Sequence, residues 1–201
     1  GLVLEYINNP TREMQELAID NNIRAIKFID NPTETNLLKA LMANYILEGI
    51  YFYSGFMFFY NLERNGKMPG SAQEIRYINR DENTHLWLFR NIIKELQNEN
   101  PELFTNEIKS ELREMMEYGV SQEILWGHYV IGDNIQGINK KLIEDYIKYL
   151  GNKRLREINL EPLYSTEYDK NPASWVDSLS NANSVKTDFF EARSTAYAKA
   201  A

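Results

Sequence analysis

The sequence has no cysteine among its 201 residues, and this absence removes several kinds of chemistry. Disulfide bonds, thiolate nucleophiles and zinc sites built on thiolates are all excluded. Long apolar runs are missing too: no stretch of about eighteen apolar residues occurs, so the sequence predicts no membrane-spanning helix. The first residues, "GLVLEYINNP", lack the basic start and the small-residue cleavage site of a signal peptide. We therefore expect a cytoplasmic protein without a membrane partner.

Positive charge is also in short supply. Lys and Arg number 22 against 29 Asp and Glu, which gives a formal net charge of -7. Non-specific nucleic-acid binding requires a basic surface, so we expect no nucleic-acid partner. The hydrophobic fraction of 43% is ordinary, and a chain of this length can bury the core of one sizeable domain.

What the sequence does contain is helical periodicity, interrupted at a few clusters of Pro, Gly and Asn. Asn31, Pro32 and Glu34 form a capping-box arrangement, and Ser71 with Glu74 forms another. No internal repeat and no convincing strand is visible. We therefore predict an all-α bundle with helices over residues 11–29, 31–63, 71–97, 100–129 and 139–158.

The character of the chain changes after Leu160. The remaining sequence has little periodicity and is rich in Ser, Asn and Thr, which is typical of irregular structure followed by a mobile tail. We therefore divide the chain into a helical-bundle portion over residues 1–160 and an irregular segment with a flexible tail over residues 161–201.

Two of the predicted helices carry charged residues on otherwise apolar stripes. Glu48 lies on one stripe, and Glu82 and His85 lie one turn apart on another, whereas Asp81 and Arg80 point to other sides of their helix. The apolar members of the two stripes are Leu37, Leu41, Tyr45, Phe52, Phe56 and Phe59 in the first helix, and Ile75, Ile78 and Phe89 in the second.

A glutamate on a core-facing stripe must be compensated, because desolvating an unpaired carboxylate costs several kcal/mol. A buried cation, a protonated carboxyl, a hydrogen-bond network or a metal ion could each do this. Lys39 and Arg80 are the nearest cations in the sequence, and both lie off the stripes. One helix that gives a Glu and another that gives Glu-x-x-His match half of a carboxylate-bridged dimetal site, whose oxygen and imidazole ligands suit iron or manganese.

Simpler interpretations of the same residues stay open. A single Glu-x-x-His motif occurs by chance and often lies on a solvated helix face. The aromatic run "YFYSGFMFFY" has the composition of ordinary bundle packing. His128 has no acidic partner at helical spacing before it, so we expect a packed core histidine there.

Several motifs, taken in order, resemble one known family. "LEGIYFYSGF" is followed by "INRDENTH", and further along stand "YVIGDNIQGINKKLIEDYIKYLGNKRLREINLEPLY", "NPASWVDS" and "FFEARSTAYAKA". Together they resemble the second half of the small, radical-generating β subunit of class I ribonucleotide reductase, from about Leu37 to the end. The resemblance implies a ferritin-like bundle and an oxidoreductase of deoxyribonucleotide synthesis.

The resemblance implies a metal site that is only partly present. Glu48, Glu82 and His85 match ligands of the family's dinuclear centre, which holds iron, manganese or one of each. In the family, the first half of the chain supplies the remaining ligands, which include another Glu-x-x-His motif, and also the radical tyrosine. This sequence contains no second Glu-x-x-His. We therefore expect the complementary N-terminal half of a β subunit as a partner, and a dimer, as in the family.

Further roles follow from the same resemblance. Phe52, Phe56 and Ile78 match the apolar pocket around the family's tyrosyl radical, where large hydrocarbon side chains keep water away. Asp81 matches the aspartate that hydrogen-bonds a metal-ligating histidine on the radical-transfer path.

The last residues resemble the tail with which the family passes its radical to the large subunit. Tyr197 matches the tail tyrosine of this transfer, and Glu191 matches the acidic residue before it. The large (α) subunit is therefore the second expected partner. The short stretch after Tyr197 departs from members with a longer docking peptide.

Two other functions are compatible with these residues. A homodimer could complete its own site, since two copies would bring four Glu and two His together, and it would then act as a ferritin-like dimetal oxidase. Alternatively, an inactive helical module could bind the large subunit without any chemistry.

Overall fold

A computed structural model describes Thr11, Met14 and residues 33–180 of the chain. Within residues 33–180 the chain forms helices and turns with no strand, which confirms the predicted all-α class. The helix predicted over residues 11–29 lies outside the described residues, apart from Thr11 and Met14. The elements are α2 (Glu34–Gly49), α3 (Tyr53–Arg64), α4 (Pro69–Glu99), η3 (Pro101–Leu103), α5 (Asn106–Val130), α6 (Lys140–Glu157), η4 (Thr166–Asp169) and α7 (Ser174–Ser180).

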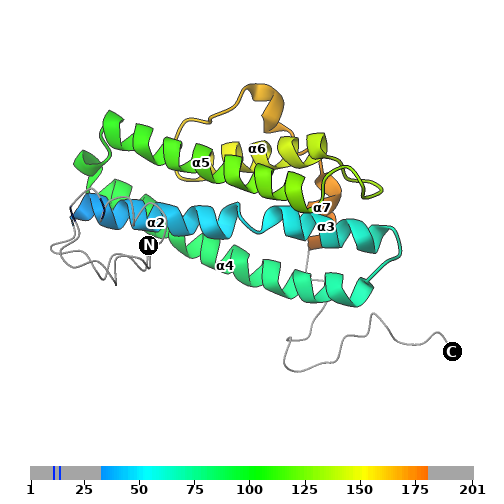
Figure 1. The fold of residues 1–201 in the computed structure, drawn as a ribbon. Helices are drawn as coiled ribbons and strands as arrows, with labels where there is room; N and C mark the ends of the chain where they lie inside the picture. The colour runs from blue at the N-terminus through cyan, green and yellow to red at the C-terminus, as the bar shows by residue number, and fades with distance from the viewer. Residues whose placement is uncertain (1–10, 12–13, 15–32, 181–201) are drawn as a thin grey trace.

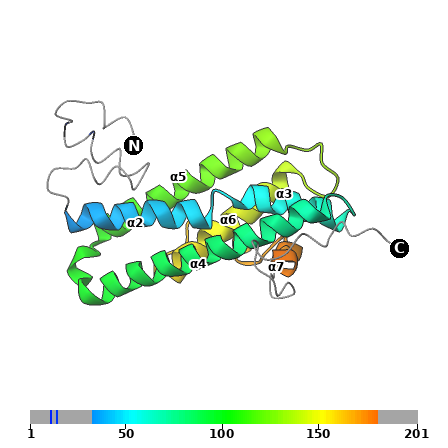
Figure 2. The same ribbon diagram turned by 90° about the horizontal axis from the view of Figure 1, so that it is seen from below.

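The long helices form an up-and-down bundle. Helices α2 and α3 lie end to end, α4 returns beside both of them, and α5 and α6 form a second pair on the other side (Figures 1 and 2). Large side chains fill the space between the helices, and burying each contributes about 1.5–3 kcal/mol. Those with almost no exposed surface include Met42, Tyr45, Tyr60, Met116 and Tyr146.

Side-chain caps fix where several helices begin. The Thr33 hydroxyl accepts a hydrogen bond from the Asn36 N–H at 3.2 Å, so Thr33 caps α2, and Asn31 lies outside the described residues. The Asn139 side chain accepts from the Leu142 N–H at 2.8 Å, as predicted for α6. Such bonds satisfy N–H groups that lack partners within the helix.

Two predicted helix starts are wrong by a few residues. Helix α4 begins at Pro69, because the fixed φ of proline suits the first helical position, and Met68 before it is left-handed with φ 47°. Helix α5 begins at Asn106 because Thr105 supplies the cap, whereas Pro101 starts only the short η3 turn.

The single helix predicted over residues 31–63 is also wrong, because the helical hydrogen-bond ladder is interrupted between Gly49 and Tyr53. The Tyr53 N–H donates to the Ile50 carbonyl at 3.2 Å, so the Gly49 carbonyl loses its helical donor. Residues 50–52 form a turn, and the chain continues as α3. The sequence periodicity does not show this interruption, because apolar residues continue through it.

Side chains from α5 and α6 take up the backbone groups that the interruption frees. The Ser54 N–H donates to Glu123 Oε1 at 2.9 Å, and the Gly49 carbonyl accepts from Arg154 Nε at 3.4 Å. Both charged side chains are buried, with Glu123 2% and Arg154 4% exposed. Buried backbone groups are therefore satisfied at the interruption by tertiary contacts, since the local helix cannot satisfy them.

Two glycines let α5 approach this region closely. A Cβ atom at Gly119 would lie 2.4 Å from Cγ2 of Ile46, and one at Gly127 would lie 2.8 Å from the Ser54 hydroxyl oxygen. Both glycines stand four residues from Glu123, on the same side of the helix. Their small size brings the Glu123 carboxylate within reach of the Ser54 N–H.

The segment after α6 contains more helix than the irregular structure predicted for it, because η4 and α7 both lie there. Asn152 of α6 holds its first part in place. The side-chain oxygen of this fully buried residue accepts from the N–H groups of Leu163 and Tyr164 at 3.1 and 2.9 Å, and its amide donates to the Tyr164 carbonyl at 3.1 Å.

None of the helices in the described residues has both the length and the apolar character needed to cross a bilayer.

The buried Glu123 carboxyl predicts a pH-dependent stability. Burial raises the pKa of Glu123 to about 7, so the unfolded chain loses this proton at a lower pH than the folded chain does. The free energy of unfolding should therefore fall as the pH rises from about 4.5 to about 7. In Glu123→Gln the amide oxygen can still accept from the Ser54 N–H. Because the amide does not titrate, the part of the pH-dependent decrease in unfolding free energy that Glu123 causes should be absent from the variant. Between pH 5 and 8 we expect wild type to lose roughly 2 kcal/mol more than the variant in urea unfolding; equal losses would contradict this.

Asn152→Ala should destabilise the fold without a change in charge. The substitution removes the partners of two N–H groups and one carbonyl, and each unpaired buried group costs about 1–3 kcal/mol. Because water can reach part of the loop, we expect a total loss of about 2–4 kcal/mol in the free energy of unfolding. Urea titration measures it, and a loss below about 1 kcal/mol would show that the loop is held by other contacts.

Candidate metal centre

Three predicted ligands, Glu48, Glu82 and His85, meet between α2 and α4. Glu48 belongs to the last turn of α2, immediately before the interruption, whereas Glu82 and His85 stand one turn apart in the middle of α4. Because α2 and α4 pack side by side, the end of one helix faces the middle of the other (Figure 2). The structure therefore brings together the two charged stripe segments that the sequence singled out.

The atoms that could bind a metal lie close to one another. Nδ1 of His85 is 2.9 Å from Oε2 of Glu82 and 3.5 Å from Oε2 of Glu48. One ligand atom from each residue can be chosen so that all lie within 4.8 Å of one another. Two carboxylates and one imidazole in this arrangement form a donor set that suits iron or manganese.

The two carboxylates affect the acid strength of their neighbours. Partial burial, together with the hydrogen bond and negative charge of Glu82, raises the pKa of Glu48 to about 7 against the opposing effect of His85. The hydrogen bond that His85 donates to the Glu82 carboxylate raises the pKa of His85 above its ordinary value, and burial opposes this. Two carboxylates beside a single imidazole leave an excess of negative charge, which a divalent cation would neutralise. The residues present therefore fit a metal ion.

One side of the cluster is open. The side chains of Glu48 and Glu82 are 14% and 16% exposed, whereas His85 is 52% exposed. The predicted core-facing stripe on α4 is confirmed only in part, since Ile75 and Phe89 pack partly buried against the core, whereas Ile78 on the same side is 45% exposed. The buried side of α4 instead carries Gly70, Ala72, Gln73, Tyr77, Asn79, Leu86 and Ile93.

The three residues predicted to line the radical pocket differ in how far they are buried. The rings of Phe52 and Phe56 stack with their centroids 6.1 Å apart, and Phe56 is only 3% exposed. Phe52 is half-buried, and Ile78 lies on the open side of α4. The two phenylalanines thus form a stacked apolar pair where α3 begins, and the role of all three residues stays a prediction.

Of the predicted radical-transfer residues, Asp81 is exposed and paired with its neighbour in the chain, and the others lie outside the described residues. Asp81 forms an ion pair with Arg80, with Oδ1 and Nε 3.2 Å apart, and its side chain is 61% exposed. Tyr197 and Glu191 belong to the part of the chain that the structure does not describe. His128 is half-buried rather than a core histidine, with Nε2 3.0 Å from the Lys140 carbonyl oxygen.

Sequence reasoning missed the buried polar groups beside the cluster. Arg154 donates to the Tyr53 hydroxyl at 2.9 Å and lies 3.2 Å from Glu157, and Glu123 approaches from α5. The spacing of Gly119, Glu123 and Gly127 was the available signal, because small residues four apart permit close helix packing. Arg154 gave no comparable signal in the sequence.

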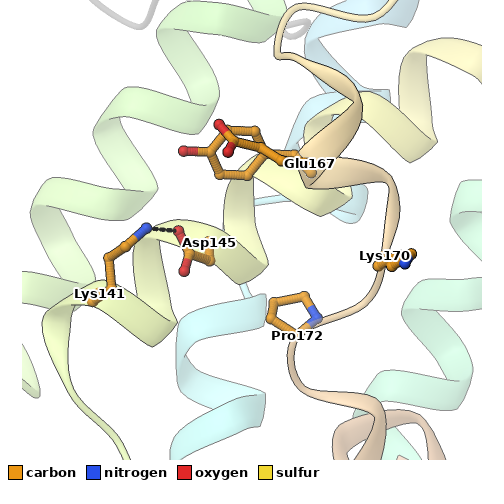
Figure 3. Close-up of a pocket in the computed structure, with 6 residues that line it drawn as sticks. Lys141, Asp145, Glu167, Lys170 and Pro172 are labelled. Atoms are coloured by element: carbon orange, nitrogen blue, oxygen red, sulfur yellow. Dashed lines mark hydrogen bonds and ion pairs between the residues drawn. The ribbon is translucent and has the colours of Figure 1, made fainter.

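A shallow hollow lies elsewhere on the surface, between the start of α6 on one side and η4 with the residues that follow it on the other (Figure 3). Its charges are of both signs, and Lys141 is already paired with Asp145. It lacks the apolar lining typical of a ligand pocket, so the cluster on α2 and α4 is the stronger candidate site. The hollow is lined by Lys141, Asp145, Glu167, Tyr168, Lys170 and Pro172.

Comparisons with known proteins point to one family. Residues 5–172 match the family model "Ribonucleotide reductase, small chain". The chain is 61% identical over 174 residues to the ribonucleoside-diphosphate reductase subunit beta of Treponema pallidum, covering 86% of this chain and 50% of that protein. It is 45% identical to the same subunit of Halalkalibacterium halodurans, covering 94% of this chain and 53% of the relative.

A solved structure gives the same result. The ribonucleotide reductase R2 subunit from Clostridium botulinum superposes with a TM-score of 0.74 at 51% identity, covering 89% of this chain and 60% of that one. The chain thus spans about half the length of the curated relatives it matches. Its fold is ferritin-like, as the family resemblance implied. The extent of the family match and these identities show that the chain belongs to the ribonucleotide reductase small-chain family.

Proposed function

We propose that this chain contributes half of the dimetal centre of a ribonucleoside-diphosphate reductase β subunit, and so takes part in deoxyribonucleotide synthesis as an oxidoreductase component. The observation that carries the proposal is the convergence of Glu48, Glu82 and His85 from two helices. The family membership supports it. When bound, a pair of iron ions, manganese ions or one of each would supply the oxidising power that converts a tyrosine into a radical.

The described residues would have separate tasks in such a centre. Glu48 and Glu82 would bind through carboxylate oxygens, and His85 would bind through Nδ1, the ring nitrogen that faces both carboxylates. Phe52 and Phe56 would exclude water from the side of the cluster near the interruption. Ile78 would complete this apolar lining once the open side is covered.

The remaining ligands and the radical tyrosine would come from a complementary N-terminal half of the β subunit. The half-exposed imidazole of His85 supports this, because the open side of the cluster leaves room for further ligands. Asp81 and Tyr197 would pass the radical to the large subunit, with Glu191 as the acidic residue of the tail. The complete protein would work as a dimer in the cytoplasm.

A self-completing homodimer is the second candidate, and the same open side of α4 favours it. Two copies meeting at this surface would supply four carboxylates and two imidazoles. Metal analysis of the purified chain separates the two candidates: the homodimer would retain about one metal ion per chain through purification, whereas a half-site would bind added Mn(II) only weakly until its complementary chain is present. An inactive module that binds the large subunit would show no dependence on the metal ligands.

Replacing one ligand tests the proposed centre. Glu82→Gln removes one charged donor, so we expect the affinity for Mn(II) to fall by about ten-fold or more. Without metal, the variant should be as stable as wild type or more stable, because the repulsion between two carboxylates is relieved. Equilibrium dialysis measures the first effect, and urea unfolding measures the second.

Glu95→Gln is the matched control, since it makes the same change at an exposed position of the same helix. It should leave both the Mn(II) affinity and the free energy of unfolding unchanged.

Addition of the complementary half and Fe(II) in air should then give dimetal absorption and a radical signal with wild type. Equal Mn(II) binding by wild type and Glu82→Gln would rule out the proposed centre.

A further inference from the structure

The interruption between α2 and α3 is held by two buried ionisable side chains, one basic and one acidic. Arg154 of α6 contacts the carbonyl of Gly49, the last residue of α2, and Glu123 of α5 accepts from the N–H of Ser54 in the first turn of α3. A cation thus meets the carbonyl end of one helix and a carboxyl group meets the N–H end of the next. This is the arrangement that helix dipoles favour.

Helices α2 and α3 both pack beside α4, and each half of the interrupted helix also makes its own side-chain hydrogen bond to a neighbouring helix. Helix α2 is bound to α6, because the Tyr45 hydroxyl donates to the Arg154 carbonyl at 3.0 Å. Helix α3 is bound to α4 by the Asn79 amide, which donates to the Tyr60 hydroxyl at 3.1 Å. A continuous helix would fix the rotation of one half relative to the other. Closing the interruption would therefore move Glu48, which directly precedes Gly49.

Arg154 also connects the interruption to α4, the helix that carries the other two members of the cluster. Its Nη2 donates to the Tyr53 hydroxyl at 2.9 Å, and that hydroxyl lies 3.5 Å from Oδ1 of Asn83. Asn83 directly follows Glu82 in α4. One guanidinium group thus contacts the residue beside Glu48 and, through Tyr53, reaches the residue beside Glu82.

We propose that Glu123 and Arg154 are positioning residues: they keep the helix interrupted between Gly49 and Tyr53 and thereby set where Glu48 lies relative to Glu82 and His85. This inference rests on the proposed metal centre for its functional meaning. It assigns a role to two buried ionisable side chains that lie outside the ligand set, and it explains why residues of α5 and α6 would control metal affinity.

The test compares Mn(II) affinity in variants of the 201-residue chain, measured from the electron paramagnetic resonance signal of free Mn(II). Glu123→Leu removes the acceptor for the Ser54 N–H, and Arg154→Met removes the donor to the Gly49 carbonyl. Each should raise the dissociation constant about ten-fold or more, as loss of residues that orient ligands does. Glu123→Gln should stay within about two-fold of wild type, because its amide oxygen still accepts the hydrogen bond.

Asn152→Ala is the matched control for general destabilisation. It is buried in α6 two residues before Arg154, but its side chain binds the 163–164 segment instead of the interruption. Its dissociation constant should equal that of wild type when both are measured at the same folded fraction. If Arg154→Met does not fold, Glu123→Leu decides the question.

The possible results separate this inference from the proposed metal centre. If Glu123→Leu and Arg154→Met bind Mn(II) as wild type does while Glu82→Gln loses it, the metal centre stands and the positioning role is wrong. If wild type binds no Mn(II), the proposed centre fails in this chain, and amide hydrogen exchange decides the positioning role. The positioning role is supported if the Ser54 amide exchanges about ten-fold faster, or more, in Glu123→Leu than in Asn152→Ala. Equal exchange rates in the two variants would overturn it.

Discussion

The carboxylates of Glu48 and Glu82 lie beside one imidazole, and this concentration of negative charge constrains the structure around it. Burial and the neighbouring carboxylate raise the pKa of Glu48 to about 7, so the chain tolerates the pair more easily when one proton or one cation is present. A cluster that is costly without a cation is suited to bind one. The apolar packing of the rest of the bundle offsets the free-energy cost of holding the two carboxylates close together.

The position of Glu48 depends on contacts that are distant in sequence. Glu123 and Arg154 come from α5 and α6, yet they bind the two backbone groups on either side of the turn that follows α2. The core helices therefore do more than enclose the cluster. They determine the direction in which α2 ends, and with it the place where the Glu48 carboxylate meets α4.

The sequence predicts the helices well where local signals define them, as at Asn139, whose side chain caps α6. It predicts Glu48, Glu82 and His85 because charged residues on an apolar stripe stand out at helical spacing. The interruption at residues 50–52 was not predicted, since its freed backbone groups are satisfied by α5 and α6 and not by neighbours in the chain. The exposure of Ile78 and His85 was missed for a related reason: an apolar stripe shows that a surface is suited to burial, not that this chain alone buries it.

The central claim is that Glu48, Glu82 and His85 bind a metal ion together, and the most direct measurement is pulsed electron paramagnetic resonance of Mn(II) bound to the chain. The chain has only two histidines, so the spectrum is simple to assign. We predict coupling of Mn(II) to one histidine nitrogen, a change in that coupling on ¹⁵N-histidine labelling, and its loss in His85→Gln but not in His128→Gln. Bound Mn(II) without histidine coupling, or with coupling that survives in His85→Gln, would contradict the account.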